Sequence, residues 1–164
     1  MSAIHLRPWT AGDLDVLQRG NEPEMTMHLG GPETDAQVVA RHERYLKLWA
    51  AGAARMFVIM DGSQKVGSMG YWGSEWAGAA TLEAGWMVYP EHQSKGYGTT
   101  ALKLLVEDAK AHPNGCTMLT AYPSVENRAS NAICRNAGFT KIGALDEEYR
   151  GAQLTLNVWG ISIV

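Results

Sequence analysis

The stretch from Met87 to His112 places the tightest limits on the fold, because it joins a β-rich run, a proline-containing bend, a Gly-x-Gly turn and an amphipathic helix. Gly96 and Gly98 have no Cβ, so the backbone from Ser94 to Thr99 can approach a ligand closely and direct several N–H groups at it. The predicted helix leaves these first amides without partners, at the positive end of its dipole. The segment is therefore predicted to bind a phosphate group.

The spacing around the two glycines limits which phosphate compound fits. A P-loop needs a lysine directly after its last glycine, whereas Lys95 precedes both glycines and Thr99 follows them. A dinucleotide site fits better, because Gly96 to Ala101 satisfies G-x-G-x-x-A. The acidic residue that such a site carries about 20 residues further on is missing from Cys116 to Leu119. Dinucleotide binding and an ordinary strand-turn-helix junction stay open as alternatives.

Two sequence blocks together resemble the GNAT superfamily of acyl-CoA-dependent N-acetyltransferases. Gln93-Ser94-Lys95-Gly96-Tyr97-Gly98 resembles the pyrophosphate loop of that family, Q/R-x-x-G-x-G/A. The run from Asn127 to Phe139 resembles its second block, N-x-x-S followed by G-F. The N-x-x-S form and the β-rich lead-in LEAGWMVYPEHQ are most similar to the branch that acetylates the amino termini of ribosomal proteins. The resemblance implies an enzyme with acetyl-CoA as co-substrate.

The same resemblance implies which residues bind the cofactor. The backbone around Met87 and Val88 belongs to a strand that splays open before the loop and supplies an N–H to the developing oxyanion. The side-chain amide of Asn127 binds the pantetheine arm, unless that residue is only a helix N-cap. Arg128 and Arg135 are further candidates for contacting the CoA phosphates. The complete set of implied cofactor-binding residues is Met87, Val88, Gln93, Ser94, Lys95, Gly96, Tyr97, Gly98, Thr99 and Asn127.

Attack of an amine on a thioester requires a neutral amine, and a lysine-type amine has a pKa of about 10.4 while an α-amine has one of about 8. A base, acting directly or through water, is therefore needed. Glu83 is the leading candidate, because strand alternation can aim its carboxylate into the cleft. The alternative is a solvated or ion-paired strand carboxylate, and Glu147 and Glu148 are the reserve candidates for the base.

The departing CoA thiolate needs a proton, because a thiol with a pKa near 8.5 leaves poorly as an anion from a dry cleft. Many GNAT enzymes supply it from a tyrosine, but Cys134 stands at that position. In the ribosomal-protein branch a serine that matches Ser130 takes this role, and Ser130 is our candidate acid. We expect direct attack in a ternary complex, with an acyl-Cys134 route as a testable alternative.

Composition agrees with one domain that spans residues 1–164. The formal net charge of −3 leaves no polybasic face, so no nucleic-acid partner is expected and a cationic amine would not be repelled. Neither a membrane-length apolar run nor a signal region is found, so we expect no membrane partner and a cytoplasmic location. The five histidines lack metal-ligand spacing, so no metal is expected, and Cys116 and Cys134 are expected to be reduced thiols.

Hydrophobic periodicity predicts alternating strands and helices without a linker or repeat. The expected strands are His5–Trp9, Met56–Met60, Val66–Trp72, Thr81–Tyr89, Met118–Tyr122, Thr140–Ala144 and Leu154–Ile161. The helices are expected to open near Thr10, after the capping box Thr34-x-x-Gln37, at the Gly-x-Gly turn and at Asn127. These elements predict an α/β (α+β) chain with a central mixed sheet flanked by helices. The resemblance implies that this is a single-domain GNAT fold, whose mostly antiparallel twisted sheet is splayed at the CoA site.

The acceptor is defined less well than the donor. Two polar loops, Gly20–Glu33 and Gly73–Ala80, are predicted to border its site, and Trp76 is the aromatic residue expected to line it. We expect a small-molecule amine, with a peptide or protein amino terminus as the alternative. A non-catalytic acyl-CoA sensor is a second class of function, and a homodimer is one option for the assembly.

Overall fold

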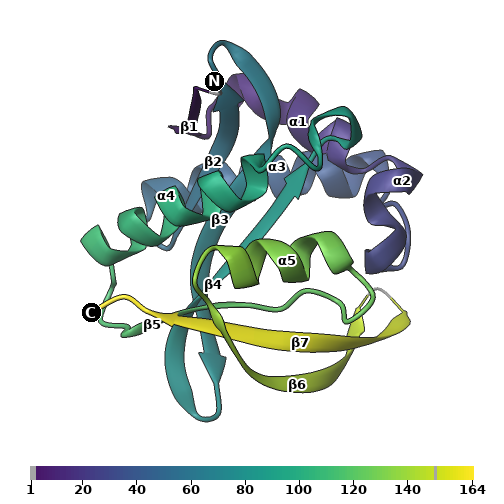
Figure 1. Cartoon of the computed structure of the whole chain (residues 1–164). Coiled ribbons are helices and arrows are strands. Elements are labelled where there is room, and N and C mark those ends of the chain that lie inside the picture. The colour runs from purple at the N-terminus through teal and green to yellow at the C-terminus, as the bar shows by residue number, and fades with distance from the viewer. Residues whose placement is uncertain (1–2, 150) are drawn as a thin grey trace.

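A computed structural model describes residues 3–149 and 151–164 of the protein. Within these residues a single sheet has seven strands in the order β1-β2-β3-β4-β5-β7-β6 (Figure 1). The strands are β1 (Ile4–Pro8), β2 (Ala54–Asp61), β3 (Gln64–Trp76), β4 (Ala79–Val88), β5 (Met118–Ala121), β6 (Thr140–Tyr149) and β7 (Ala152–Ser162). Neighbouring strands are antiparallel except for the parallel pair β4 and β5, which confirms the predicted mixed sheet.

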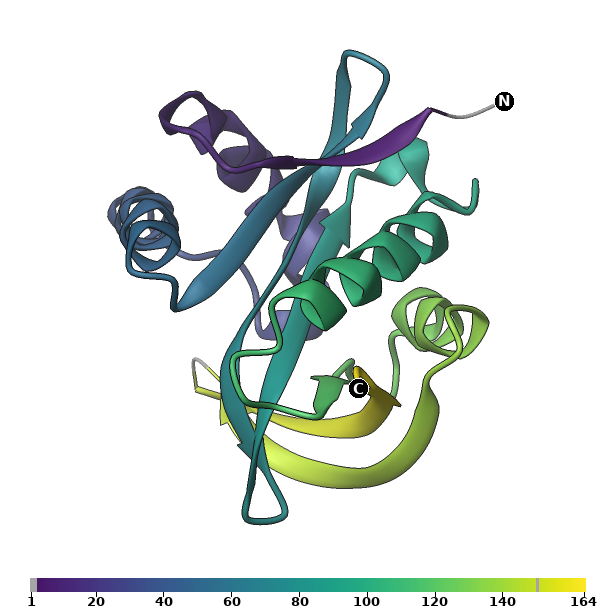
Figure 2. The same cartoon turned by 90° about the vertical axis from the view of Figure 1, so that its left-hand side faces the viewer.

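Helices cover both faces of this sheet (Figure 2). The helices α1 (Leu14–Gly20) and α3 (Asp35–Ala50) pack on one face, and α4 (Tyr97–Ala111) and α5 (Arg128–Asn136) lie on the other. Strand β2 is buried between the two layers: Phe57 and Ile59 belong to the core under α4, whereas Met56 and Val58 belong to the core under α1 and α3. Because successive side chains of a strand point to opposite faces, β2 contributes apolar residues to the cores on both sides of the sheet.

Two helix starts follow their predicted capping signals. The Thr34 side chain accepts a hydrogen bond from the Gln37 amide, and the Gln37 side chain accepts one from the Thr34 amide, which confirms the capping box of α3. Thr10 caps a 3₁₀ turn, η1 (Ala11–Asp13), and α1 begins directly after it. The helix predicted to open near Thr10 is therefore present, with a tighter first turn.

The stretch predicted as a loop from Gly20 to Glu33 contains two short helices instead, α2 (Pro23–Thr26) and the 3₁₀ helix η2 (Met27–Leu29). Proline occupies the first position of α2, where its fixed φ suits a helix and its missing N–H costs nothing. Gly30, with φ of 86°, ends the second helix. Proline and glycine thus punctuate a helical segment here, whereas the sequence pattern was interpreted as irregular.

The predicted loop from Gly73 to Ala80 is also wrong, because β3 continues to Trp76 and β4 begins at Ala79. Only Ala77 and Gly78 form the turn, with φ of 51° and 81°. Positive φ at both central residues is the geometry of a type I′ hairpin turn. The usual Asn-Gly or Asp-Gly signal is absent, which explains why the strands were predicted to end early. The β6–β7 hairpin is likewise longer than predicted.

A buried carboxylate ties the first strand to the first helix. Asp13 is 1% exposed and accepts hydrogen bonds from the Arg7 guanidinium at 3.0 and 2.8 Å and from the Thr10 amide at 2.8 Å. The Lys65 ammonium lies 3.0 Å from the same carboxylate. Burial alone raises the pKa of Asp13, but the bonds from Arg7 and Lys65 outweigh it and hold that pKa well below its usual range.

We predict that Asp13→Asn lowers the free energy of unfolding by about 3 kcal/mol, because it leaves two cations without their shared buried partner. The folded-state pKa lies below the unfolded value of about 3.9, so the stabilisation is complete above that pH and is lost as the pH falls below it. Urea unfolding at neutral and acidic pH measures both effects. Asp15→Asn is the control, because Asp15 contacts the same Lys65 at 2.9 Å but is 62% exposed, and it should cost less than about 1 kcal/mol. Equal losses in the two variants would contradict the assignment.

Candidate active site

The chain turns sharply between the end of β4 and the start of α4. A 3₁₀ turn, η3 (Pro90–His92), leads into residues 93–99, which we call the cradle. The Gln93 side chain donates a hydrogen bond of 2.9 Å to the Val88 carbonyl and so ties the cradle to the strand. Ser94 and Gly96 have φ of 61° and 80°, a left-handed backbone that folds the cradle back on itself before α4.

Within the cradle, the Gln93 amide donates a hydrogen bond to the Pro90 carbonyl, whereas the amides that follow it are free of acceptors among the described residues. In the described part of the chain, none of the backbone N–H groups of residues 94 to 99 donates a hydrogen bond to the protein, and the first helical bond runs from the Thr100 amide to the Gly96 carbonyl at 3.1 Å. Unpaired amides at a helix N-terminus form an anion site. The geometry is the one that the Gly-x-Gly turn predicted.

Two contacts hold the start of α4 in place. The Tyr97 hydroxyl donates a hydrogen bond of 2.9 Å to Asp61 at the end of β2. Gly98 is buried, and a Cβ on it would lie 2.5 Å from the Cδ1 atom of Ile133 on α5. Glycine at this position therefore lets α4 and α5 approach closely beside the cradle.

The sheet opens next to the cradle, as predicted. Strand β4 pairs with β5 only from Leu82 to Ala84, so residues 85 to 88, which we call the open edge, pair with β3 alone. The Tyr89 amide donates to the Val66 carbonyl on β3. Amides alternate in direction along a strand, so the Val88 N–H points away from β3 and toward the gap.

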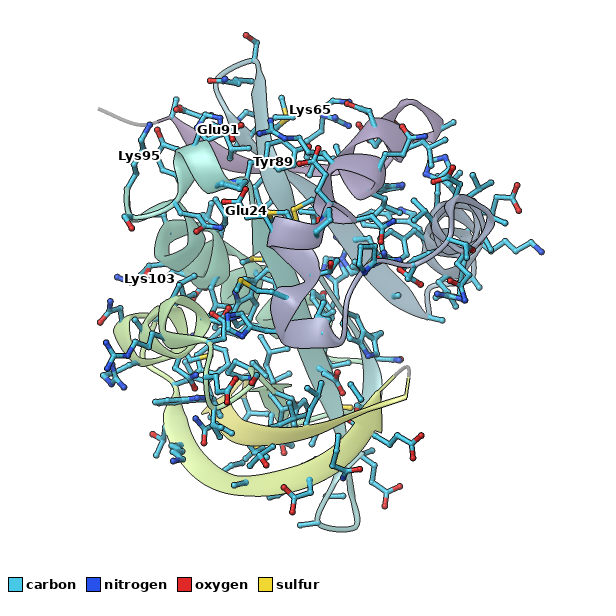
Figure 3. All side chains as sticks on the ribbon, turned by 90° about the vertical axis from the view of Figure 1, so that its right-hand side faces the viewer. Glu24, Lys65, Tyr89, Glu91, Lys95 and Lys103 are labelled. Carbon is cyan, nitrogen blue, oxygen red and sulfur yellow. The ribbon has the colours of Figure 1, made fainter. Side chains whose placement is uncertain are left out.

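A cavity of about 670 Å³ extends from the open edge between α2 on one side and β6 and β7 on the other. Of the predicted site residues, Glu83, Met87, Val88, Gln93, Asn127 and Ser130 line it. The predicted residues from Ser94 to Thr99 lie around the N-terminus of α4, and Figure 3 shows Lys95 there on the outer side of the cradle and Glu24 on α2. We call the cavity of about 670 Å³ the acceptor cavity.

Glu83 lies on β4 just before the open edge and is partly buried. Burial raises the pKa of its carboxyl, a hydrogen bond of 2.8 Å from the Ser74 hydroxyl opposes that rise, and the charge of Glu147 on β6 adds to it. A carboxyl with a raised pKa that faces a cavity is suited to proton transfer near neutral pH. Of the two reserve candidates, Glu147 lines the same cavity and Glu148 does not.

The start of α5 presents two predicted residues to the cavity. The Asn127 side-chain oxygen accepts a hydrogen bond of 3.1 Å from the Ser130 amide, so Asn127 is the N-cap of this helix. The cap uses only the oxygen, and the side-chain NH₂ has no protein acceptor among the described residues. The Ser130 hydroxyl likewise has no protein partner within the described residues, and it lines the cavity.

Asn131 is a positioning residue that the sequence pattern did not reveal. It is 7% exposed, its NH₂ donates to the carbonyls of Ser124 and Asn127, and its oxygen accepts from Asn157 and Trp159 on β7 at 2.9 Å each. These bonds fix the start of α5, and therefore Ser130, against the sheet. An asparagine in the interior of a predicted helix was the available signal.

Cys134 lies one turn beyond Ser130 but faces the protein core. It is fully buried, it does not line the acceptor cavity, and burial raises the pKa of its thiol to about 12. Both cysteines are free thiols, as predicted. A thiol that neither reaches the cavity nor ionises is unsuited to carry an acyl group.

The aromatic lining differs from the prediction. Trp76 packs against Tyr122, with 6.4 Å between ring centroids, and against Gly143 on β6, and it does not line the cavity. Trp72 and Trp86 line it instead. Trp76 was expected to sit in a loop; because that segment is a strand, strand pairing carries Trp76 away from the cavity.

Among residues 3–149 and 151–164, no three histidine, cysteine, aspartate or glutamate side chains are grouped so that they could hold a metal ion. In the same residues, no helix combines the length and apolar character that crossing a bilayer requires.

The family model of the acetyltransferase (GNAT) domain matches residues 3–140. The chain belongs to the GNAT acetyltransferase family. Acetyl-CoA is the co-substrate of this family. No curated protein matches the sequence of this GNAT chain significantly.

Solved structures of several GNAT enzymes share the fold. A RimL ribosomal-protein α-N-acetyltransferase in complex with coenzyme A has a TM-score of 0.79 at 17% identity and covers 97% of this chain and 93% of its own. A spermidine N-acetyltransferase from Vibrio cholerae in complex with CoA and spermine has a TM-score of 0.78 at 22% identity, with 97% and 95% covered. An aminoglycoside acetyltransferase in complex with coenzyme A has a TM-score of 0.75 at 21% identity, with 95% and 94% covered.

We predict that Gly96→Ala weakens CoA binding roughly tenfold or more, because a methyl group over the cradle blocks the diphosphate and each lost charge-assisted hydrogen bond is worth about 1.5 to 3 kcal/mol. Gly115→Ala is the matched control: both glycines have nearly equal φ, 80° and 79°, and neither Cβ would meet a protein atom within 4 Å. The strain cost should therefore be similar. Calorimetry with CoA should detect weaker binding only in Gly96→Ala; equal affinities would remove the cradle from the site.

A second prediction concerns the Ser74 hydrogen bond, which stabilises the charged form of Glu83. Because a base must be deprotonated, the rate should fall as the pH drops through the pKa of Glu83, and Ser74→Ala should raise that pKa. The acidic limb of the kcat/KM profile should therefore move to higher pH. Glu83→Gln should abolish that limb. A limb that stays in place in both variants assigns the base to another residue.

Proposed function

We propose that this GNAT acetyltransferase moves the acetyl group of acetyl-CoA to the primary amine of a small molecule by direct attack in a ternary complex. One observation carries the proposal: the open edge of β4 and the carboxylate of Glu83 line one cavity, which extends to Gln93 of the cradle, and the free amides of residues 94 to 99 follow directly in the chain. A diphosphate held by the cradle lets the pantetheine arm follow the open edge, and the thioester then reaches the cavity beside Glu83.

The bound donor is held by backbone and side-chain groups in turn. The amides of residues 94 to 99 bind the diphosphate, and Lys95 adds a positive charge on the outer side. The NH₂ group of Asn127, which the helix cap leaves unused, binds an oxygen of the pantetheine arm. Met87 and Val88 supply the strand edge along which the arm lies.

The transfer then needs three groups of the protein. Glu83 removes a proton from the acceptor ammonium, and the neutral nitrogen attacks the thioester carbon. The Val88 N–H donates to the oxyanion that forms as the C–N bond is made. When the C–S bond breaks, Ser130 donates a proton to the thiolate. The attacking nitrogen loses its second proton to solvent, and solvent returns a proton to Ser130. The products are the acetylated amine, free CoA and one proton taken up by Glu83.

The cavity lining favours a small cationic acceptor. Glu24, Glu83, Glu126 and Glu147 line it without an ion-pair partner among the described residues, and Arg41 is already paired with Glu33. Two of the similar solved structures are named for small amines, spermidine and aminoglycosides, which supports this class. The RimL enzyme acts on a ribosomal protein, so a protein amino terminus is the alternative acceptor.

A non-catalytic acyl-CoA sensor would need the cradle alone. The conjunction of Glu83 and the unpartnered Ser130 hydroxyl at the same cavity favours an enzyme instead. Thiol release from acetyl-CoA in the presence of small amines, compared with peptides that have free amino termini, distinguishes the three functions. Turnover with peptides alone would reject the small-molecule acceptor, and release with neither would favour the sensor.

We predict that Ser130→Ala lowers kcat by about 10²- to 10⁴-fold, the usual contribution of a general acid, and changes the KM for acetyl-CoA little. Its hydroxyl bonds no described protein group, so the melting temperature should stay close to that of the wild type. Cys134→Ala is the companion variant and should keep turnover, because the thiol does not reach the cavity. An unchanged kcat in Ser130→Ala, or lost turnover with intact CoA binding in Cys134→Ala, would contradict direct attack with Ser130 as acid.

A further inference from the structure

Glu147 is a charged residue of the acceptor cavity that the acetyl transfer leaves unused. It lies on β6 opposite Leu154 of β7, and both residues line the cavity. Its neighbour Glu148 does not line the cavity, because successive side chains of a strand point to opposite faces. Both carboxylates are exposed, and only that of Glu147 lines the cavity.

Glu147 has no cationic partner within residues 3–149 and 151–164. Among the described residues it takes part in neither an ion pair nor a side-chain hydrogen bond, and its charge acts across the cavity on Glu83. Two arginines line the cavity. Arg41 already pairs with Glu33 on the α3 side, and Arg128 is the first residue of α5. A ligand cation between the two strands would relieve the repulsion between Glu83 and Glu147.

The chemistry of the proposed function decides what that cation can be. The nitrogen that attacks the thioester must be neutral. Glu83 removes one proton from its ammonium form, so the negative charge of Glu83 is used up by this one nitrogen. A second carboxylate in the same cavity would only bind the unreactive ammonium form of a monoamine. It contributes to productive binding when the acceptor keeps a second positive charge throughout the reaction.

We infer that Glu147 selects acceptors with two cationic groups, so that one amine is acetylated at Glu83 while the other stays protonated and binds Glu147. This inference rests on the proposed function and names its acceptor class as a diamine. The first nitrogen loses one proton to Glu83 and bonds to the acetyl carbon. It then loses a second proton to solvent, the C–S bond breaks, and CoA takes a proton from Ser130 and leaves as the thiol. The second nitrogen gains and loses nothing.

The apolar part of the cavity lining suits the spacer of a diamine. Met56, Trp72, Leu154 and Leu156 line the cavity together with Glu83 and Glu147. These apolar side chains can cover a methylene chain while its two charged ends reach the two carboxylates. Trp72 pairs directly with Glu83 across β3 and β4, which places an aromatic ring next to the proposed base.

The test compares straight-chain diamines with monoamines of the same length: putrescine with butylamine, cadaverine with pentylamine, and hexamethylenediamine with hexylamine. Thiol release at saturating acetyl-CoA and near neutral pH, where alkyl amines with a pKa of about 10 are protonated, gives kcat/KM for each. At the preferred length the wild type should favour the diamine about tenfold, as expected for one charge-assisted hydrogen bond. The difference should lie in KM.

Glu147→Gln should reduce the diamine-to-monoamine ratio of kcat/KM about tenfold, because it removes the charge that binds the second ammonium. Any change that the substitution makes in the pKa of Glu83 affects both substrates and cancels in this ratio. Glu148→Gln is the matched control, with the same change one residue away on the other face of β6, and should keep the wild-type ratio.

The outcomes separate this inference from the function on which it rests. Equal use of monoamines and diamines by the wild type, or an unchanged ratio in Glu147→Gln, would overturn the selection of diamines while leaving small-amine acetylation intact. A ratio that falls equally in Glu148→Gln would overturn the role of Glu147. Thiol release with peptides but with no amine of the panel would overturn both proposals.

Discussion

Among the described residues, the backbone amides at the start of α4 and the unpaired edge of β4 leave polar groups without protein partners, and the proposed acetyl-CoA site depends on these groups. Buried or partly enclosed amides are costly unless something accepts their hydrogen bonds. Here β4 leaves β5 after Ala84, and the cradle turns back through left-handed Ser94 and Gly96. The fold therefore carries an unsatisfied line of donors, which the diphosphate and the acyl arm of the co-substrate are suited to fill.

The helices and strands around these unpaired groups must be held in place if the groups are to remain unpaired. On one side α4 is anchored by Tyr97 and pressed against α5 at Gly98, and on the other the first turn of α5 is fixed by the four hydrogen bonds of Asn131. Strand β2 is buried on both faces, so the sheet cannot bend toward the gap without disturbing two cores. Core packing thus keeps the surrounding sheet and helices rigid, while the unpaired amides stay available to a ligand.

The features predicted from sequence are those with local causes. The cradle, the Thr34 capping box and the cap of α5 each depend on residues within one turn, where glycine freedom or a side-chain oxygen decides the backbone. The hydrogen bond from Ser74 to Glu83 depends instead on the register of β3 against β4, and the contacts of Asn131 depend on β7. Strand register is set by packing and turn geometry, and the Ala77-Gly78 turn lacked a recognisable signal. The same hidden turn accounts for the wrong placement of Trp76.

The geometry of α5 also explains how this chain does without the tyrosine that many GNAT enzymes use. Ser130 and Cys134 are one helical turn apart on nearly the same face, yet Ser130 borders the cavity and Cys134 is enclosed by the core. A tyrosine at position 134 would need about three times the volume of a buried thiol, and close-packed cores tolerate such overpacking poorly. In the proposed mechanism the proton donor therefore comes from the turn nearer the cavity. Ser130 occupies that turn, with its amide committed to the Asn127 cap and its hydroxyl left free.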